Sequence, residues 1–276
     1  MPEKQKMRAD MALVARGLAQ SREKAQAMIM AGDVYLNEVQ IRKASFPVED
    51  LAGLTVRQPK IAFVSRGALK LQKALQVFGV DPTGLVAMDL GASTGGFTDV
   101  LLQGGAAHVY AIDVGYGQLD WKIRNDPRVT VMERTNARYL KAEDLSQHPT
   151  LAVMDVSFIS ITRILPAAMD ILGSEGQFIT LIKPQFEAGR DRVGKKGVVR
   201  DPAVHEAVIR EILHFIEEST EWHCHDLTYS PIRGPEGNIE FLAYLLPGKA
   251  GGIPAEDERI SLVVREAHRD LEKDQA

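Results

Sequence analysis

Residues 86–98 constrain the fold of this chain more than any other stretch. A short apolar run that contains Asp89 is followed by three closely spaced glycines and then by Phe97. This order predicts a buried strand, a tight turn at which a ligand can approach the backbone, and the first turn of a helix. The stretch therefore indicates an α/β fold that binds a ligand at the turn.

The spacing of the glycines excludes two classes of ligand. A phosphate-binding loop requires Lys and then Ser or Thr after Gly96, where this chain has Phe97. The glycines also lack the spacing that binds a dinucleotide. About twenty residues further along, a second apolar run ends at Asp113, a position from which a carboxylate can accept both hydroxyls of a ribose. The turn and the acid together favour S-adenosylmethionine as cofactor, and the alternative is a plain loop with a capping aspartate.

Three more apolar runs, 129–132, 151–155 and 177–182, predict further strands. Asp155 closes the second of them, and Lys183 follows the third. Since the carboxyl ends of parallel strands meet at one crevice, both side chains should face the ligand. The residues expected to contact the cofactor are Asp89, Gly91, Ser93, Gly95, Gly96, Phe97, Asp113, Asn136 and Asp155.

The length and composition of the chain limit the classes of protein to which it can belong. The 276 residues, 45% of them hydrophobic, can bury a full core, and a single cysteine excludes an internal disulfide framework. No apolar run approaches the roughly 18 residues of a membrane span, so we expect a cytoplasmic protein without a membrane partner, and a monomer is the simplest state. The run 223–225, His-Cys-His, lacks distant partners at zinc spacing, so no metal is expected.

The first part of the chain reads as a separate small unit. Residues 8–17 and 21–32 each have a helical pattern that stops at glycine, and short strands are expected at 34–37 and 54–56. The first eighty residues carry a net positive charge, although the whole chain has a net charge of −4. We expect two domains, 1–60 and 61–276, joined by a short connection that contains a proline.

The pattern of Arg8, Asp10, Arg16 and Ser21 in this unit resembles the small RNA-binding domain named after the fourth protein of the small ribosomal subunit. The resemblance implies an α+β unit that presents basic side chains to the phosphates of structured RNA. The RNA-binding candidates are Arg8, Arg16, Arg22 and Lys24. The competing interpretation is that these residues belong to solvated helix faces.

The second part predicts a doubly wound α/β domain. Five strand and helix units alternate, and a hairpin formed by 227–229 and 239–246 closes the sheet. Ser65 is expected to cap the helix that carries Lys70, and Glu240 stands within an otherwise apolar strand.

The whole chain resembles the TlyA or hemolysin-type ribosomal RNA methyltransferases, whose second domain is a 2'-O-methyltransferase of the FtsJ type. The resemblance covers nearly the full length and rests on the runs 65–71, 89–97, 155–160, 183–187 and 237–241. It implies a mostly parallel, seven-stranded methyltransferase sheet. It also implies that the substrate is the ribose 2'-hydroxyl of a cytidine in ribosomal RNA, presented within a ribosomal subunit. The catalytic tetrad that it implies is Lys70, Asp155, Lys183 and Glu240.

The chemistry explains why such a tetrad is needed. A ribose hydroxyl is a poor nucleophile at neutral pH, so the enzyme must align the attack and remove one proton. We assign Lys183 as the proton acceptor, since burial beside the second cation of Lys70 favours a neutral lysine. Asp155 and Glu240 would hold the two lysines in place.

Further RNA contacts are expected outside the small unit. The segment 188–200 is rich in glycine and basic residues, which suits RNA phosphates, although a solvated loop explains it equally well. The additional candidates are Arg66, Arg190, Arg192, Lys195 and Lys196.

Three other functions remain open. A methyltransferase acting on a base or a protein would keep the cofactor turn but would not need two lysines. A membrane-lytic protein would need an apolar segment that this chain lacks. A noncatalytic RNA-binding or ribosome assembly factor is harder to exclude, because an enzyme can also chaperone its RNA.

Overall fold

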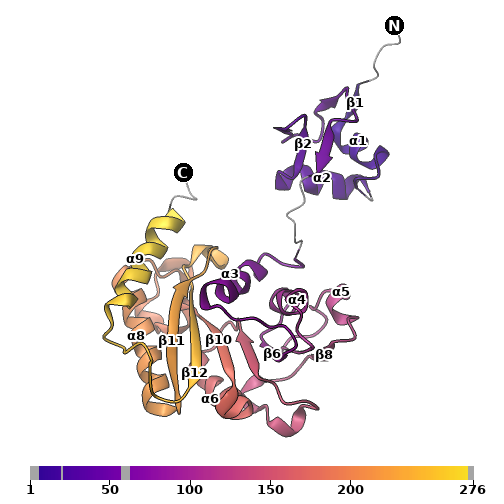
Figure 1. The fold of residues 1–276 in the computed structure, drawn as a ribbon. Helices are drawn as coiled ribbons and strands as arrows, with labels where there is room; N and C mark the ends of the chain where they lie inside the picture. Colours follow the sequence, from indigo (N-terminus) through magenta and orange to yellow (C-terminus); the bar gives the residue numbers. More distant parts are fainter. Residues whose placement is uncertain (1–5, 20, 57–62, 273–276) are drawn as a thin grey trace. The chain divides into compact units, whose positions relative to one another are not determined.

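The computed structural model describes residues 6–19, 21–56 and 63–272, apart from a few side chains that include that of Lys195. The chain divides into two compact units, Met1–Ala62 and Phe63–Ala276 (Figure 1). The boundary expected between residues 60 and 61 lies outside the described residues and stays a prediction.

The first unit packs two helices against short strands. Ser21 caps the second helix by accepting a hydrogen bond from the amide of Lys24 at 3.3 Å, and Gly32 ends it with φ +83°. Apolar residues of both helices and of the strands, among them Leu13, Ile29 and Leu54, form one buried cluster. The elements are β1 (Met7–Arg8), α1 (Ala9–Ala15), α2 (Arg22–Ala31), β2 (Val34–Leu36), β3 (Val39–Gln40), β4 (Pro47–Val48) and β5 (Leu54–Val56).

The second unit is built on a seven-stranded sheet in the order β11-β12-β10-β9-β6-β7-β8. Strand β12 runs antiparallel to both of its neighbours, and the other paired strands are parallel, which confirms the predicted mostly parallel sheet. The strands are β6 (Val86–Leu90), β7 (His108–Ile112), β8 (Val129–Met132), β9 (Leu151–Met154), β10 (Gln177–Ile182), β11 (Trp222–Tyr229) and β12 (Phe241–Pro247).

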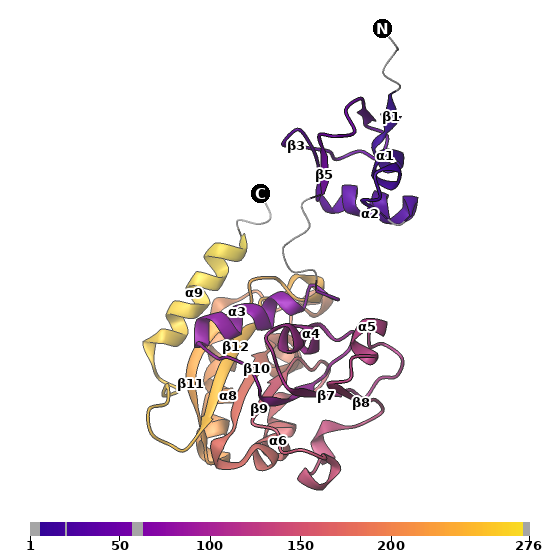
Figure 2. The ribbon, with the colours of Figure 1, turned by 45° about the vertical axis from the view of Figure 1, so that its right-hand side comes forward.

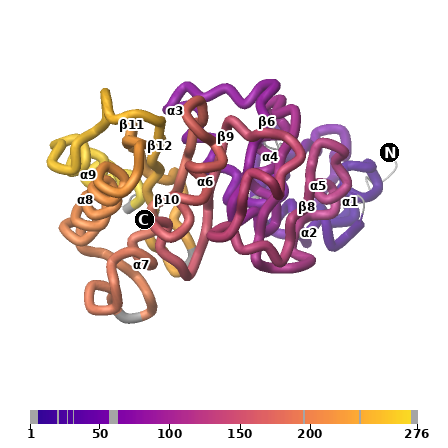
Figure 3. Tube along the Cα trace, turned by 90° about the horizontal axis from the view of Figure 1, so that it is seen from below, coloured from indigo at the N-terminus to yellow at the C-terminus, as the bar shows by residue number. Residues whose placement is uncertain are grey.

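Helices cover both faces of this sheet (Figures 2 and 3). Alternate strand residues point to opposite faces, so Met88 packs in the cluster under α6, α8 and α9, whereas Ala87 packs in the cluster under α3, α4 and α5. The helices are α3 (Ala68–Phe78), α4 (Gly96–Gln103), α5 (Trp121–Arg124), α6 (Leu165–Leu172), α7 (Pro184–Glu187), α8 (Pro202–Ser219) and α9 (Glu258–Glu272). The 3-10 turns are η1 (Ala137–Tyr139), η2 (Ala142–Asp144), η3 (Ile161–Arg163), η4 (Gly173–Glu175), η5 (Arg190–Arg192), η6 (Lys195–Gly197) and η7 (Pro235–Gly237).

Two local predictions were wrong. Helix α3 begins at Ala68 after Gly67, with no side-chain cap, because Ser65 belongs to a preceding turn in which its carbonyl accepts from the amide of Ala68 at 3.2 Å. Strand β12 begins at Phe241, so Glu240 stands before the strand and does not interrupt it. Among the described residues, no helix combines the length and the apolar character needed to cross a membrane.

Candidate active site

A cavity of about 590 Å³ lies where the glycine turn meets the carboxyl ends of β9 and β10. We call it the lysine cavity, because both lysines of the predicted tetrad line it. The residues that line it are Ser65, Gly67, Lys70, Gly91, Ala92, Ser93, Thr94, Gly96, Phe97, Asp155, Ser157, Phe158, Lys183, Gln185, Phe186, Lys196, Gly197, Glu236, Asn238 and Glu240.

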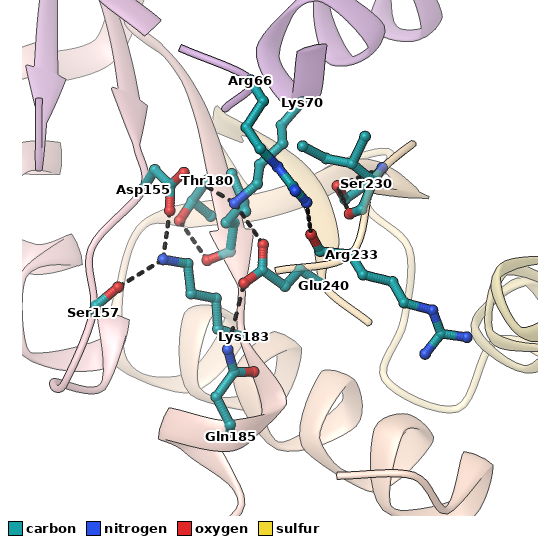
Figure 4. Close-up of polar contacts among 12 residues, drawn as sticks. Arg66, Lys70, Asp155, Ser157, Thr180, Lys183, Gln185, Ser230, Arg233 and Glu240 are labelled. Carbon is teal, nitrogen blue, oxygen red and sulfur yellow. Dashed lines mark hydrogen bonds and ion pairs between the residues drawn. The ribbon is translucent and has the colours of Figure 1, made fainter. Parts of the chain in front are cut away.

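The structure brings all four predicted tetrad residues into one ionic network (Figure 4). The two carboxylate oxygens of Asp155 lie 2.5 Å from Lys183 Nζ and 3.2 Å from Lys70 Nζ. Glu240 Oε2 lies 2.6 Å from Lys70 Nζ. Asp155 is therefore shared between the two lysines, and Lys70 is shared between two carboxylates.

Each member of the network comes from a different element. Lys70 lies in the first turn of α3, Asp155 and Lys183 follow the neighbouring parallel strands β9 and β10, and Glu240 precedes β12, the other neighbour of β10. Both lysine side chains are only 7% exposed and the Glu240 side chain is fully buried, so the charges must satisfy one another.

The opposite charges in the network keep Lys70 and Asp155 ionised. Burial alone would lower the pKa of Lys70, but Asp155 and Glu240 outweigh it and raise that pKa above its ordinary value. Burial alone would raise the pKa of Asp155, but the two lysines outweigh burial and lower that pKa below its ordinary value. The expectation that burial beside a second cation favours a neutral lysine concerns Lys183, and for that residue it stays a prediction.

Two further polar residues join the network, and the sequence analysis gave neither of them a role. Ser157 Oγ accepts a hydrogen bond from Lys183 Nζ at 2.9 Å, and Gln185 Nε2 donates to Glu240 Oε1 at 3.4 Å. Both lie two residues beyond a tetrad residue, which is the one sequence signal that pointed to them. Lys183 thus has one charged and one neutral partner, whereas Lys70 has two charged partners.

Phe158 is the most exposed large apolar residue that the structure describes, at 91% of its accessible surface. Its backbone adopts φ +65°, a conformation that costs free energy for a residue with a bulky side chain. Its ring lies 5.1 Å from the ring of Phe186, and it lines the lysine cavity. A strained, solvent-facing aromatic ring beside buried charges indicates a ligand contact.

A second cavity, of about 470 Å³, adjoins the first at Gly91, Ser93, Asp155, Ser157 and Phe158. We call it the Asp113 cavity. It is also lined by Ile112, Asp113, Val114, Gln118, Thr135, Asn136, Ala137, Val156, Ile159 and Ile164.

The Asp113 cavity fits a nucleoside cofactor. Gly91 adopts φ +88°, and a Cβ atom there would come within 2.8 Å of the Asp155 carbonyl, so only glycine allows this close approach of two backbones. The carboxylate of Asp113 is held in place by the amides of Ser93 and Gly115, at 2.8 and 2.7 Å. Together with the apolar side walls, this arrangement suits a ribose and a base, and it opens toward the lysines.

Seven of the nine residues expected to contact the cofactor line at least one cavity, and Asp89 and Gly95 do not. Asp89 is fully buried and accepts hydrogen bonds from the amide and the hydroxyl of Thr98, at 2.9 and 2.6 Å, so it fixes the start of α4. A Cβ atom at Gly95 would meet Leu119 at 2.9 Å, so this glycine serves helix packing. The cofactor contacts of the other seven residues stay predictions.

In the first unit, the three arginines among the candidate RNA contacts bind within the protein. Arg8 and Arg22 both pair with the buried carboxylate of Asp10, at 3.0 and 2.9 Å, and about half of each side chain stays exposed. Arg16 donates to the carbonyl of Leu51. The side chain of Lys24 is exposed.

In the second unit, some of the candidate RNA contacts also bind within the protein, and others are exposed. Arg66 donates to the carbonyl of Arg233 at 2.7 Å, and Arg192 forms two hydrogen bonds to Glu211, at 2.7 and 2.9 Å. Arg190 and Lys196 are exposed, and Lys196 lines the lysine cavity. The side chain of Lys195 lies outside the described residues. Arg66 and Arg192 thus help to hold loops, which the sequence analysis did not anticipate.

Comparisons with known proteins agree with this architecture. Residues 63–246 match the model of the FtsJ-like methyltransferase family, and residues 7–53 match the S4 domain. The chain is 46% identical to the 16S/23S rRNA (cytidine-2'-O)-methyltransferase TlyA of Mycobacterium tuberculosis, over 86% of this chain and 89% of the relative.

Two further relatives cover most of the chain. It is 42% identical to hemolysin A of Brachyspira hyodysenteriae, over 87% of this chain and 100% of the relative. A solved structure described as a "putative hemolysin from Streptococcus thermophilus" is 42% identical, with a TM-score of 0.76 and 99% of both chains covered. The chain therefore belongs to the FtsJ-like methyltransferases, which use S-adenosylmethionine, and it carries an S4 domain ahead of its methyltransferase domain, as the resemblance in its sequence implied.

Proposed function

We propose that this protein transfers a methyl group from S-adenosylmethionine to the ribose 2'-hydroxyl of a cytidine in ribosomal RNA. The observation that carries the proposal is the network in which Asp155 lies between Lys70 and Lys183 while Glu240 completes the set. The Mycobacterium tuberculosis relative bears this activity in its name. A base or protein methyltransferase would have no use for two buried lysines joined by one carboxylate.

S-adenosylmethionine, when bound, supplies a methyl group already activated by its positive sulfur. The chain's own residues must align the hydroxyl for attack along the sulfur–methyl bond and accept its proton. The hydroxyl oxygen would take the methyl group while the sulfur keeps the electron pair of the broken bond, and the hydroxyl proton would pass to the lone pair on Nζ of a neutral Lys183. The two N–H bonds of this neutral nitrogen can donate to Asp155 and Ser157, which leaves its lone pair for the substrate hydroxyl.

Lys70 plays a different part. Two carboxylates hold it as a fixed cation, so it orients Asp155 and Glu240 and does not exchange a proton with substrate. Phe158, at the junction of the two cavities, provides a face on which the target base can stack once it has left its RNA helix.

The partner and the setting follow from the substrate. We propose that the enzyme acts as a monomer on RNA within a ribosomal subunit, with the S4 domain holding structured RNA near the target. A ribosomal substrate also places the protein in the cytoplasm. At the S4 surface, the exposed halves of Arg8 and Arg22 are available to phosphates, and the exposed Lys24 is a further candidate contact. In the methyltransferase domain, the exposed Arg190 and Lys196 are candidate phosphate contacts as well.

The test is transfer of labelled methyl groups to purified ribosomal subunits and to naked RNA by the unaltered protein, Lys183→Ala and Lys141→Ala. Lys141 is an exposed lysine paired only with Glu143, so its variant is the matched control. Loss of the base should reduce turnover roughly 100- to 10,000-fold while affinity for S-adenosylmethionine is retained.

Two results would contradict the proposal. Full turnover by Lys183→Ala would remove its role as base. Tight cofactor binding without label on any RNA would favour a noncatalytic assembly factor or a different acceptor.

A further inference from the structure

Two exposed tyrosines lie on the loops that border the Asp113 cavity. Tyr116 and Tyr139 expose 67% and 69% of their surface, and Val114, on the wall of the cavity, exposes 70%. Exposed aromatic side chains gathered in one place are unusual on a protein surface and mark an interaction site.

These residues belong to the loops that follow β7 and β8. The two strands are parallel neighbours, and the loops are joined by hydrogen bonds from the amide of Arg134 to the carbonyl of Gly115, at 3.0 Å, and from Thr135 to Asp113, at 2.9 Å. The two tyrosines therefore lie on neighbouring loops at the carboxyl ends of these strands.

Two arginines lie over these two rings. The guanidinium of Arg134 lies 4.2 Å from the centre of the Tyr116 ring, and that of Arg138 lies 5.3 Å from the centre of the Tyr139 ring. Among the residues that the structure describes, no carboxylate pairs with either arginine. This separates them from Arg8 and Arg22 in the S4 domain, whose charge is shared with Asp10.

The neighbouring acids are already engaged. Asp113 accepts from two backbone amides, Glu133 pairs with Arg124, and Asp120 caps α5 through the amide of Lys122. The two guanidinium groups therefore remain free to bind an external anion. Their flat faces and the exposed rings offer stacking surfaces as well.

We propose that Tyr116, Arg134, Arg138 and Tyr139 form a second RNA-binding surface, which takes unpaired nucleotides of the substrate. Unstacked bases can stack on the aromatic rings while phosphates bind the arginines. A protein partner is less favoured, because an apolar protein surface that docked on these rings would not require two arginines without a carboxylate partner. The proposal rests on the proposed RNA substrate and adds RNA contacts beside the Asp113 cavity.

The experiment measures binding of fluorescently labelled RNA to the full chain, with a single-stranded oligonucleotide and a hairpin of equal length as probes. The variants are Tyr116→Ala and Tyr139→Ala, with Tyr116→Phe as the control that keeps the ring. Leu262→Ala, on α9, controls for loss of an exposed apolar side chain elsewhere. Affinity for S-adenosylmethionine is measured in parallel for every protein.

Each alanine variant should bind the single-stranded RNA about tenfold more weakly, while the phenylalanine and Leu262 variants and all cofactor affinities stay unchanged. A loss confined to cofactor affinity would mean that these rings cover the cofactor, and would overturn the proposal. Unchanged RNA affinity in both alanine variants would overturn it while leaving the proposed methyl transfer intact. If the unaltered protein bound neither probe, the proposed surface would be overturned, and methyl transfer to ribosomal subunits would still decide the proposed function.

Discussion

Two aspartates near the carboxyl ends of neighbouring strands differ in the groups that surround their carboxylates. Asp89, in β6, is fully buried with Thr98 as its donor partner, and burial raises its pKa to about 7. Asp155 follows β9, the strand beside β6, and two ammonium groups hold its pKa below the ordinary value against the effect of burial. One carboxylate is thus buried without a counter-charge and the other with two.

The difference distinguishes a carboxylate that stabilises the fold from one that takes part in the chemistry of the site. Asp89 fixes the first turn of α4, a task that needs an acceptor oxygen but no charge, so the protein tolerates its tendency to become neutral. Asp155 must stay charged to hold two lysines beside a substrate, so both counter-charges are built around it. A buried acid with paired cations therefore marks the site, whereas a buried acid alone does not.

The largest expected effect comes from removing the charge of Asp155. In Asp155→Asn, the two lysines would face each other with Glu240 as the remaining carboxylate, so turnover should fall by roughly 1000-fold and the free energy of unfolding by about 3 kcal/mol. Methyl-transfer assays and urea denaturation measure the two changes. Asp126→Asn, which breaks an exposed pair with Arg128, is the control and should cost less than about 1 kcal/mol. Equal losses of turnover and stability in Asp155→Asn and Asp126→Asn would contradict the role given to the charge of Asp155.

The fold was predictable from local patterns in the sequence, and the tetrad was predictable from the resemblance to a known family. Strand ends, the glycine turn and the closing hairpin place Asp155, Lys183 and Glu240 at one edge of the sheet once the strands are assumed to be parallel. The partners were harder to predict. That Asp10 binds Arg8 and Arg22, and that Arg192 binds Glu211, depends on tertiary contacts, so residues expected to be free for RNA proved to be engaged.

Other differences arise from backbone conformation. Ser65 has the side chain of a helix cap, but its turn ends before α3 begins, and propensity alone does not fix such a boundary. Phe158 has φ +65°, a conformation that nothing in its residue type predicts. Asp89 belongs to the glycine-turn motif, yet its side chain points into the protein, which the order of residues did not reveal.

The second prediction concerns the pH dependence of Asp89. Its carboxyl binds a proton more tightly in the folded state than its ordinary value of 3.8 allows when unfolded, so stability falls as the pH rises from about 4 to about 7. The loss could reach about 4 kcal/mol. In Asp89→Asn, this pH dependence should disappear, because the amide keeps an acceptor for Thr98 and never ionises. Urea denaturation at about pH 4, the lower end of this range, and at about pH 8, one unit above its upper end, tests this, and an unchanged pH dependence of stability in Asp89→Asn would contradict it.

The smallest expected effect separates the two lysines. Lys70 has two carboxylate partners, whereas Lys183 has Asp155 and the neutral hydroxyl of Ser157, and this asymmetry assigns Lys183 as the lysine that can exchange a proton. Ser157→Asp would give Lys183 a second carboxylate, which favours its ammonium form, so the pH at half-maximal turnover should rise by about one unit. Ser157→Thr keeps a hydroxyl and should leave the profile in place. A purely structural role for Ser157 would lower turnover at every pH without moving the midpoint, and that outcome would leave the choice between the two lysines to be made on other grounds.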